Sequence, residues 1–243
     1  MVMIMEEPVG RADRPGEGGR PDKRRAILDG ALAVFARDGY TRASVDAIAR
    51  EAAVSTRTIY NQFHDKATLF GEVIQDSARR VAQAQITLLQ RYLTKVVDVE
   101  ADLIEFGRVW ATPMPEFRAH FALVRQINAE AGHVPQAALD AWQESGPRRV
   151  RAELARLLGR LGERGLLRLD DPERAAVHFA VLTAAEVTAR TYHGALPLPE
   201  AEIHRLADSG VRAFLHGYAG LAAVRSAGEV CLTRQPLAAD EHS

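Results

Sequence analysis

The chain has 243 residues and a formal net charge of −1; 47% of its residues are hydrophobic and only 6% are aromatic. No window holds eighteen consecutive apolar residues, which argues against a transmembrane helix. Cys231 is the only cysteine, so an internal disulfide is excluded. Because the N-terminus also lacks the pattern of a signal peptide, a cytoplasmic protein is expected. Ala, Leu and Arg are abundant and β-branched runs are rare, so the composition predicts helix throughout.

Apolar residues at helical spacing predict a first helix over residues 21–38. Pro21 suits its first turn, and Gly39 suits a left-handed C-terminal cap. A basic cluster at residues 23–25 opens this helix. It is either a solvated turn or a set of phosphate contacts, and beside a DNA-binding motif the two interpretations are equally good.

Residues 44–63 predict two short helices joined by a tight turn. Ser44 precedes the first helix and Ser55 the second, and each hydroxyl can accept a hydrogen bond from a free N–H of its helix. The exposed positions of the second helix carry short polar side chains, one arginine and one tyrosine, which suit base edges and phosphates. A solvated polar face is the alternative. The paired caps, the turn length and the flanking helix together favour a helix-turn-helix that enters the DNA major groove.

The charge of this segment is locally positive. Residues 20–66 hold nine Lys or Arg against six Asp or Glu, a surplus of three. A modest basic face on a dimer is enough for DNA binding and predicts marked salt sensitivity.

Residues 23 to 70 resemble the DNA-binding domain of TetR-type (tetracycline-repressor-like) regulators. The residues that carry the resemblance are Gly39, Tyr40, Ser44, Val45, Ile48, Ala49, Val54, Ser55, Thr58, Ile59, Tyr60, Phe63, Lys66, Leu69 and Phe70. Similarity to this family implies an all-α homodimer with an N-terminal three-helix helix-turn-helix DNA-binding domain and a C-terminal helical ligand-binding and dimerisation domain. The family usually has glycine in the turn, where this chain has Ala53; alanine in a left-handed conformation costs roughly 1 kcal/mol.

The resemblance also implies which residues contact DNA. By position, the phosphate contacts would come from Thr41, Arg42 and Ser44, and the base contacts from Thr56, Arg57, Thr58 and Asn61. Tyr60 and Lys66 would hold the DNA backbone, Lys66 from the start of the connecting helix. The full expected set is Thr41, Arg42, Ser44, Ser55, Thr56, Arg57, Thr58, Tyr60, Asn61, His64 and Lys66.

Beyond residue 66 the chain alternates helical periodicity with proline and glycine breaks. Helices are expected over 66–92 (with or without a break near Asp76), 98–111, 116–130, 148–164, 172–193 and 200–217, with a further helix between residues 135 and 146. The expected organisation is a disordered tail at 1–19, the DNA-binding domain at 20–66, the ligand and dimer domain at 67–221 and a C-terminal tail at 222–243. Residues 144–172 resemble the C-terminal domain of the AefR-like subgroup of these regulators.

The last two helices carry apolar stripes that must pack on something. Core packing within one subunit is one interpretation. The resemblance favours the other, a four-helix dimer interface, because a two-fold DNA site needs a two-fold protein. The expected interface residues are Phe179, Thr183, Val187, Ile203, Leu206, Gly210, Val211, Phe214 and Tyr218.

A ligand pocket is expected among the aromatic, Met and Arg side chains of the C-terminal domain, although each such residue is individually more typical of a core. The candidates are Phe106, Trp110, Met114, Phe121, Arg125, Trp142, Phe179 and Tyr192. No metal-ligand spacing, phosphate loop or catalytic motif is present, so neither a cofactor nor an enzymatic reaction is expected.

The sequence thus favours a homodimeric transcriptional repressor that a small molecule releases from a palindromic operator. Activation stays possible. The alternatives are a helical small-molecule carrier and a DNA-binding protein without an effector, whose pocket would be filled by side chains.

Overall fold

The computed structural model describes residues 19–218, which form ten α-helices and one short 3-10 turn without a strand. The all-α expectation is therefore confirmed for these residues. The expected C-terminal tail, Cys231 and residues 1–18 of the expected N-terminal tail lie outside them. No helix in this described part is long and apolar enough to cross a membrane.

The first three helices are one long helix followed by two short helices that begin with serine caps. They are α1 (Gly19–Arg42), α2 (Val45–Glu51) and α3 (Thr56–Phe63). Gly39 interrupts α1 with φ 78° and ψ 174°, so the expected positive φ is present at the end of the regular helix. Ala53 takes φ 52° in the turn between α2 and α3, as expected.

The remaining helices follow the expected order closely. They are α4 (Lys66–Leu93), α5 (Val99–Ala111), α6 (Arg118–Ala129), α7 (Gln136–Ser145), α8 (Pro147–Glu163), α9 (Pro172–Arg190) and α10 (Glu200–Tyr218), with the turn η1 (Pro115–Phe117) before α6. Of the two possibilities left open for α4, the unbroken helix is the one found. Prolines at the first turns of α8 and α9 and glycines at the breaks explain why most of these boundaries follow from the sequence.

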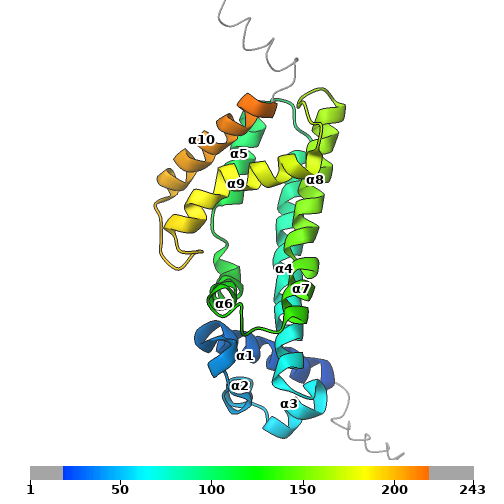
Figure 1. Ribbon diagram of the computed structural model, residues 1–243, viewed down its shortest axis with the longest axis vertical. Coiled ribbons are helices and arrows are strands. Elements are labelled where there is room, and N and C mark those ends of the chain that lie inside the picture. Colours follow the sequence, from blue (N-terminus) through cyan, green and yellow to red (C-terminus); the bar gives the residue numbers. More distant parts are fainter. Residues whose placement is uncertain (1–18, 219–243) are drawn as a thin grey trace, which may run out of the picture.

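Figure 1 shows an elongated molecule. Helices α1, α2 and α3 form one end, and α5, α9 and α10 form the other. The long helix α4 joins the two ends, with α7 and α8 beside it, and α6 lies against α1 on the opposite side.

Two large hydrophobic clusters fill the molecule. One belongs to α1–α4 but also contains Leu123 and Ile127 of α6 and Ala138 of α7. The other lies among α4, α5, α8, α9 and α10. Because the first cluster crosses the expected boundary at residues 66–67, the N-terminal helices share their core with α6 and α7.

Candidate DNA interface and ligand cavity

Helix α3 buries one face and exposes the other. Ile59 and Phe63 are buried in the N-terminal cluster, which leaves Arg57, Tyr60 and Asn61 exposed to solvent. Tyr60 keeps 50% of its surface accessible, unusual for an aromatic side chain of a small helical unit. An exposed ring with a hydroxyl, an arginine and an amide on one short helix form a surface that can contact bases and phosphates.

Both serine caps are formed. Ser44 Oγ accepts from the N–H of Ala47, and Ser55 Oγ accepts from the N–H of Thr58, each at 3.1 Å. The Ser55 and Thr58 hydroxyls also lie 2.8 Å apart. These contacts fix the starts of α2 and α3, so the sequence-predicted capping is confirmed.

Ion pairs use some of the basic residues of this end and leave others exposed. Arg24 pairs with Glu72, and Arg25 pairs with Asp29 and with Asp76 at 2.9 Å. The basic cluster of α1 therefore ties this helix to α4. Within residues 19–218, the exposed Arg42, Arg50 and Arg57 have no ion-pair partner. These three are the arginines left for phosphate or base contacts at the α2–α3 end.

Lys66 requires a correction. Its ammonium donates to the carbonyls of Tyr40 (2.9 Å), Ala43 (3.2 Å) and Thr41 (3.3 Å) and lies 4.8 Å from the centre of the Tyr40 ring. Three N–H groups are all that a lysine ammonium has. Lys66 therefore holds the α1–α2 connection onto α4 instead of facing DNA.

Replacement of Lys66 by methionine should lower the free energy of unfolding by about 1.5–3 kcal/mol, because three carbonyls lose a charged donor. The salt dependence of DNA binding should not change. Urea unfolding and DNA titrations across salt concentrations would measure both, with Lys95→Met, an exposed lysine just after the end of α4, as control. Unchanged stability with a salt slope reduced by about one would show a phosphate contact instead.

Thr41 joins the N-terminal helices to the end of α6. Its backbone N–H and hydroxyl donate to Glu130 Oε2 at 2.9 and 3.1 Å. These bonds stabilise the ionised carboxylate and lower the pKa of Glu130. A methyl group at Gly39 would meet Glu130 Oε1 at 2.3 Å. The expected phosphate-contacting Thr41 thus binds the end of α6 in this arrangement.

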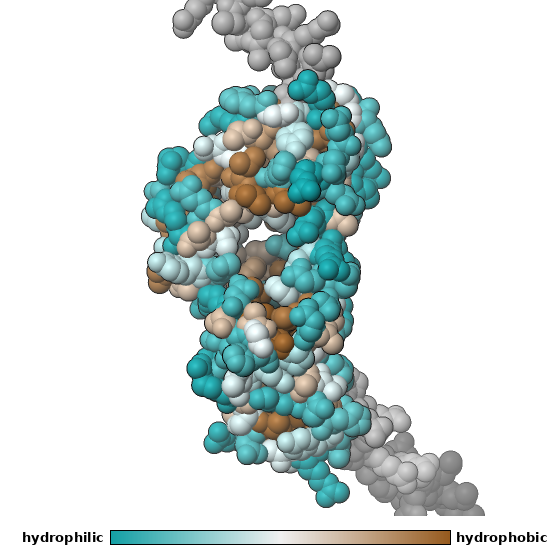
Figure 2. Space-filling model, in the orientation of Figure 1, coloured by the Kyte–Doolittle hydropathy of each residue, from teal (hydrophilic) through white to brown (hydrophobic). Residues whose placement is uncertain are grey.

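A cavity of about 630 Å³ lies between α4 and the layers formed by α6 and α9, within the size range of small-molecule sites. Figure 2 shows the molecule hollowed at this level, with apolar residues along the opening. Its walls are mostly small and apolar, and they include Ala78 and Ala82 of α4, Val150 and Leu154 of α8 and Ala180 of α9.

The cavity wall also contains a buried titratable group, His120 on α6. Its Nδ1 lies 3.0 Å from Ser77 Oγ, which in turn donates to the carbonyl of Ile74 at 3.3 Å. Burial lowers the pKa of His120 to about 4, and the nearby charge of Arg80 acts in the same direction. His120 is therefore neutral at pH 7 and presents no positive charge to the cavity.

The expected ligand residues divide into two groups. Trp110, Met114, Phe121 and Trp142 line the cavity. Phe106 and Phe179 do not, because they stack on each other at 5.3 Å inside the second cluster and are fully buried. The sequence could not distinguish cavity-lining residues from core residues, because aromatic residues at helical spacing face the interior in both situations.

The last two candidates, Arg125 and Tyr192, lie at or beside the turn after α9. Tyr192 is 64% exposed and does not line the cavity, whereas its neighbours Thr191 and His193 do. Arg125 donates through Nη1 to the carbonyl of His193 at 2.8 Å. Arg125 thus connects this turn to α6. Contrary to the expectation, neither Arg125 nor Tyr192 is among the residues that line the cavity.

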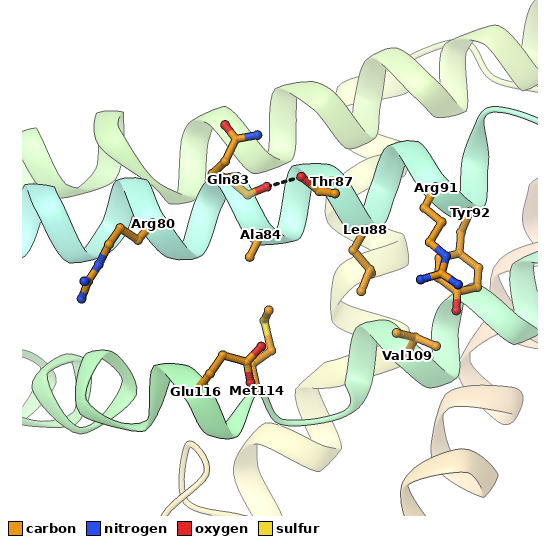
Figure 3. A pocket seen from close by; sticks show the side chains of 10 residues that line it. All are labelled: Arg80, Gln83, Ala84, Thr87, Leu88, Arg91, Tyr92, Val109, Met114 and Glu116. Atoms are coloured by element: carbon orange, nitrogen blue, oxygen red, sulfur yellow. Dashed lines mark hydrogen bonds between the residues drawn. The ribbon is translucent and has the colours of Figure 1, made fainter.

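A second hollow, of about 660 Å³ and more open, lies on the other side of α4. In Figure 3, Leu88 and Ala84 of α4 face Met114 and Glu116 across it, and Arg91 lies beside Val109. Met114 also lines the cavity described above. The two spaces therefore share this side chain.

The expected dimer residues require a correction. Phe179, Thr183, Val187, Ile203, Leu206, Gly210, Val211 and Phe214 are all buried within one subunit, and Tyr218 is half-buried against Phe214, with ring centres 4.6 Å apart. The reason is that α10 packs on both α5 and α9 and uses its apolar stripe there. The alternative of core packing holds for these positions.

Sequence reasoning missed His120 and Glu130. A signal existed for His120, because it shares a buried face with Leu123 and Ile127 at spacings of three and seven residues. No local signal existed for Glu130, whose partner Thr41 is 89 residues away. Among residues 19–218 no group of three His, Cys, Asp or Glu side chains gathers to hold a metal ion.

Comparison with known proteins gives matches to two family models. Residues 27–73 match the bacterial regulatory proteins of the tetR family. Residues 101–220 match the C-terminal domain of AefR-like transcriptional repressors. The two matches coincide with the helix-turn-helix end and with the helices around the cavity.

Comparison with individual proteins indicates the same family. A TetR-family transcriptional regulator from Mesorhizobium loti MAFF303099 is 32% identical, with a TM-score of 0.72 over 82% of this chain and 98% of that one. The flavonoid-responsive regulator FrrA is 29% identical, with a TM-score of 0.59 and the same coverage. HTH-type transcriptional repressor Rv1474c of Mycobacterium tuberculosis is 37% identical over 60 residues, 25% of this chain and only 32% of that protein. The chain therefore belongs to the TetR family of bacterial DNA-binding transcriptional regulators and carries an AefR-like C-terminal domain.

Proposed function

We propose that this chain is a homodimeric transcriptional repressor that binds a palindromic operator through α3 and is released by a small molecule bound in the 630 Å³ cavity. The observation that carries the proposal is the position of α6, which belongs to the cavity and to the N-terminal core at once. Residues 20–66 would serve as the DNA-reading unit and residues 67–221 as its control.

Helix α6 presents different residues to the two regions. His120, Phe121 and Val124 line the cavity, while Leu123 and Ile127 belong to the cluster that holds α1. Glu130, directly after the helix, accepts two hydrogen bonds from Thr41. A ligand that displaces the cavity face of α6 would therefore also displace α1 and, through it, the recognition helix.

This coupling needs a ligand that prefers one arrangement. A compound that binds equally to the DNA-bound and released forms would change nothing, however tightly it binds. The cavity also counts against the effector-independent alternative, which predicts a pocket filled by side chains. The name of FrrA, a relative that responds to flavonoids, supports a ligand-responsive role for this chain.

A dimer would use the exposed apolar residues of α9. Val181 is 56% exposed and Leu182 is 44% exposed, and Ala185 continues this face one turn further. Val181 and Ala185 also line the cavity, so a partner on this face would lie beside its opening. Exposed apolar residues in a row favour contact with a partner. A second copy would supply the second recognition helix, about one DNA turn away, that a palindromic operator requires.

The combined replacement of Arg57 and Tyr60 by alanine should weaken operator binding at least about 30-fold, because the two half-sites together lose about 2 kcal/mol or more. Fluorescence anisotropy with labelled DNA from upstream of the protein's own gene would measure the loss.

The matched control replaces Arg149 and Tyr192, an exposed arginine and an exposed tyrosine remote from α3. It should bind as the wild type does. Equal losses in both variants, or no loss in the first, would contradict the assignment of α3 as the recognition helix.

A further inference from the structure

Two indole N–H groups are buried at the cavity without a hydrogen-bond partner. Trp110 Nε1 and Trp142 Nε1 have no acceptor among the described residues, and both side chains line the cavity. A buried donor without an acceptor costs about 1–3 kcal/mol, and tryptophan N–H groups normally find a partner when buried. Each such group therefore calls for an explanation.

The two tryptophans come from different helices and pack on different hydrophobic clusters. Trp110, at the end of α5, packs on the second hydrophobic cluster and lies 5.8 Å from the Phe106 ring. Trp142, on α7, packs on the cluster of the N-terminal helices. A ligand that reaches both has to extend from one cluster to the other, which favours an elongated shape. The several alanines of the wall favour flat rings.

The charges of the wall limit the ligand further. Among the described residues that line the cavity there is no Asp or Glu, while Arg151 is present. His120 is neutral and buried, so it adds no charge to the wall. A buried cation would pay its desolvation cost here without a carboxylate to compensate it.

We infer that the effector of this site is an elongated, flat, apolar molecule without positive charge that carries a hydrogen-bond acceptor oxygen near each end. A small rotation of either indole brings its N–H to the ligand oxygen, and the ligand thereby removes the cost of the unpaired donor. This inference rests on the proposed function for its biological meaning, but ligand binding can be measured without DNA.

The test compares three naphthalenes of similar size by equilibrium dialysis against the full-length protein. The probes are 2,6-diacetylnaphthalene, with a carbonyl at each end, 2,6-diethylnaphthalene, with none, and trimethyl(naphthalen-2-ylmethyl)ammonium, a cation. The diacetyl probe should bind at least about tenfold more tightly than the diethyl probe, and the cation should bind more weakly than the diacetyl probe.

Trp110→Phe combined with Trp142→Phe keeps two aromatic rings and removes both N–H groups. In this variant the preference for the diacetyl probe should fall to less than about twofold, while the affinity for the diethyl probe stays within about threefold of the wild type. Tyr92→Phe is the matched control, because Tyr92 lines the other hollow, and it should keep the full preference.

Equal binding of the diacetyl and diethyl probes, a preference that survives in the double variant, tightest binding of the cation, or no binding of any probe would each overturn the inference. The melting temperature of every variant would be recorded, and the single replacements would be used if the double variant were unfolded. Operator binding by the same wild-type sample separates the outcomes. Specific DNA binding without the ligand preference overturns this inference alone, and absence of specific DNA binding overturns the proposed function.

Discussion

Replacement of Gly210 by alanine should lower the free energy of unfolding by about 3 kcal/mol, since added volume in a packed contact typically costs 1–3 kcal/mol and more where it meets backbone. A Cβ atom there would lie 2.0 Å from the Leu182 carbonyl oxygen and 2.9 Å from Thr183 Cα. These are backbone atoms of α9, which cannot rotate away. The two helices would have to separate.

Helix α10 has no free direction in which to move. On its other side, a Cβ added at Gly107 of α5 would lie 2.6 Å from the Val211 side chain. The melting temperature should therefore fall by roughly 6–12 °C in a protein of this size. Thermal and urea unfolding followed by circular dichroism would measure both quantities.

Gly217→Ala is the matched control for this prediction. Gly217 lies in the same helix, and a Cβ there would meet no atom within 4 Å. Alanine should be neutral or stabilise the helix by up to about 1 kcal/mol. A Gly210→Ala protein within about 0.5 kcal/mol of the wild type would show that α9 and α10 do not cross this closely.

The second large effect is a loss of stability in acid caused by His120. Its pKa is about 4 in the folded protein and about 6.5 in an unfolded chain. Between these values the unfolded state binds a proton that the folded state does not. The contribution of His120 to stability is therefore constant above pH 6.5 and falls as the pH drops towards 4, by about 3 kcal/mol in total.

His120→Gln removes this titration and keeps a side chain that can bond to Ser77. Urea unfolding at pH 7.5, 6.5, 5.5 and 4.5 should show a smaller loss for the variant than for the wild type, and the difference isolates His120 from the carboxylates that also titrate in acid. His133→Gln, at an exposed position of the turn before α7, should keep the wild-type profile. Parallel curves for wild type and His120→Gln would contradict a buried, neutral histidine.

The helix-turn-helix followed from the sequence because its determinants are local. Ser44 and Ser55 each accept a hydrogen bond from the N–H group three residues ahead, and Ala53 turns the chain between the two helices. Each of these features depends on residues within one or two turns. The same holds for most helix boundaries of the C-terminal part, which coincide with proline and glycine.

Contacts between distant segments did not follow from the sequence. The stripe of α10 has the same spacing whether it covers α5 and α9 or a second subunit, so Phe214 and Val211 were assigned to the wrong surface. Lys66 carries the positive charge of a typical phosphate contact. Its position beside the three carbonyls that it binds depends on how distant segments pack, which the sequence does not reveal. Half of the expected pocket residues line the cavity for a similar reason: periodicity identifies the inward face and not the place where packing leaves space.

The most direct test of the account is the binding of the wild-type protein to labelled DNA from upstream of its own gene and to a scrambled sequence of equal length. Anisotropy titrations at several salt concentrations would give both affinities. The account predicts binding to the upstream DNA that is at least about a thousandfold tighter than to the scrambled DNA and weakens steeply with salt. Equal, weak binding to both sequences at every salt concentration would contradict a repressor that acts on the DNA upstream of its own gene. It would favour the carrier alternative.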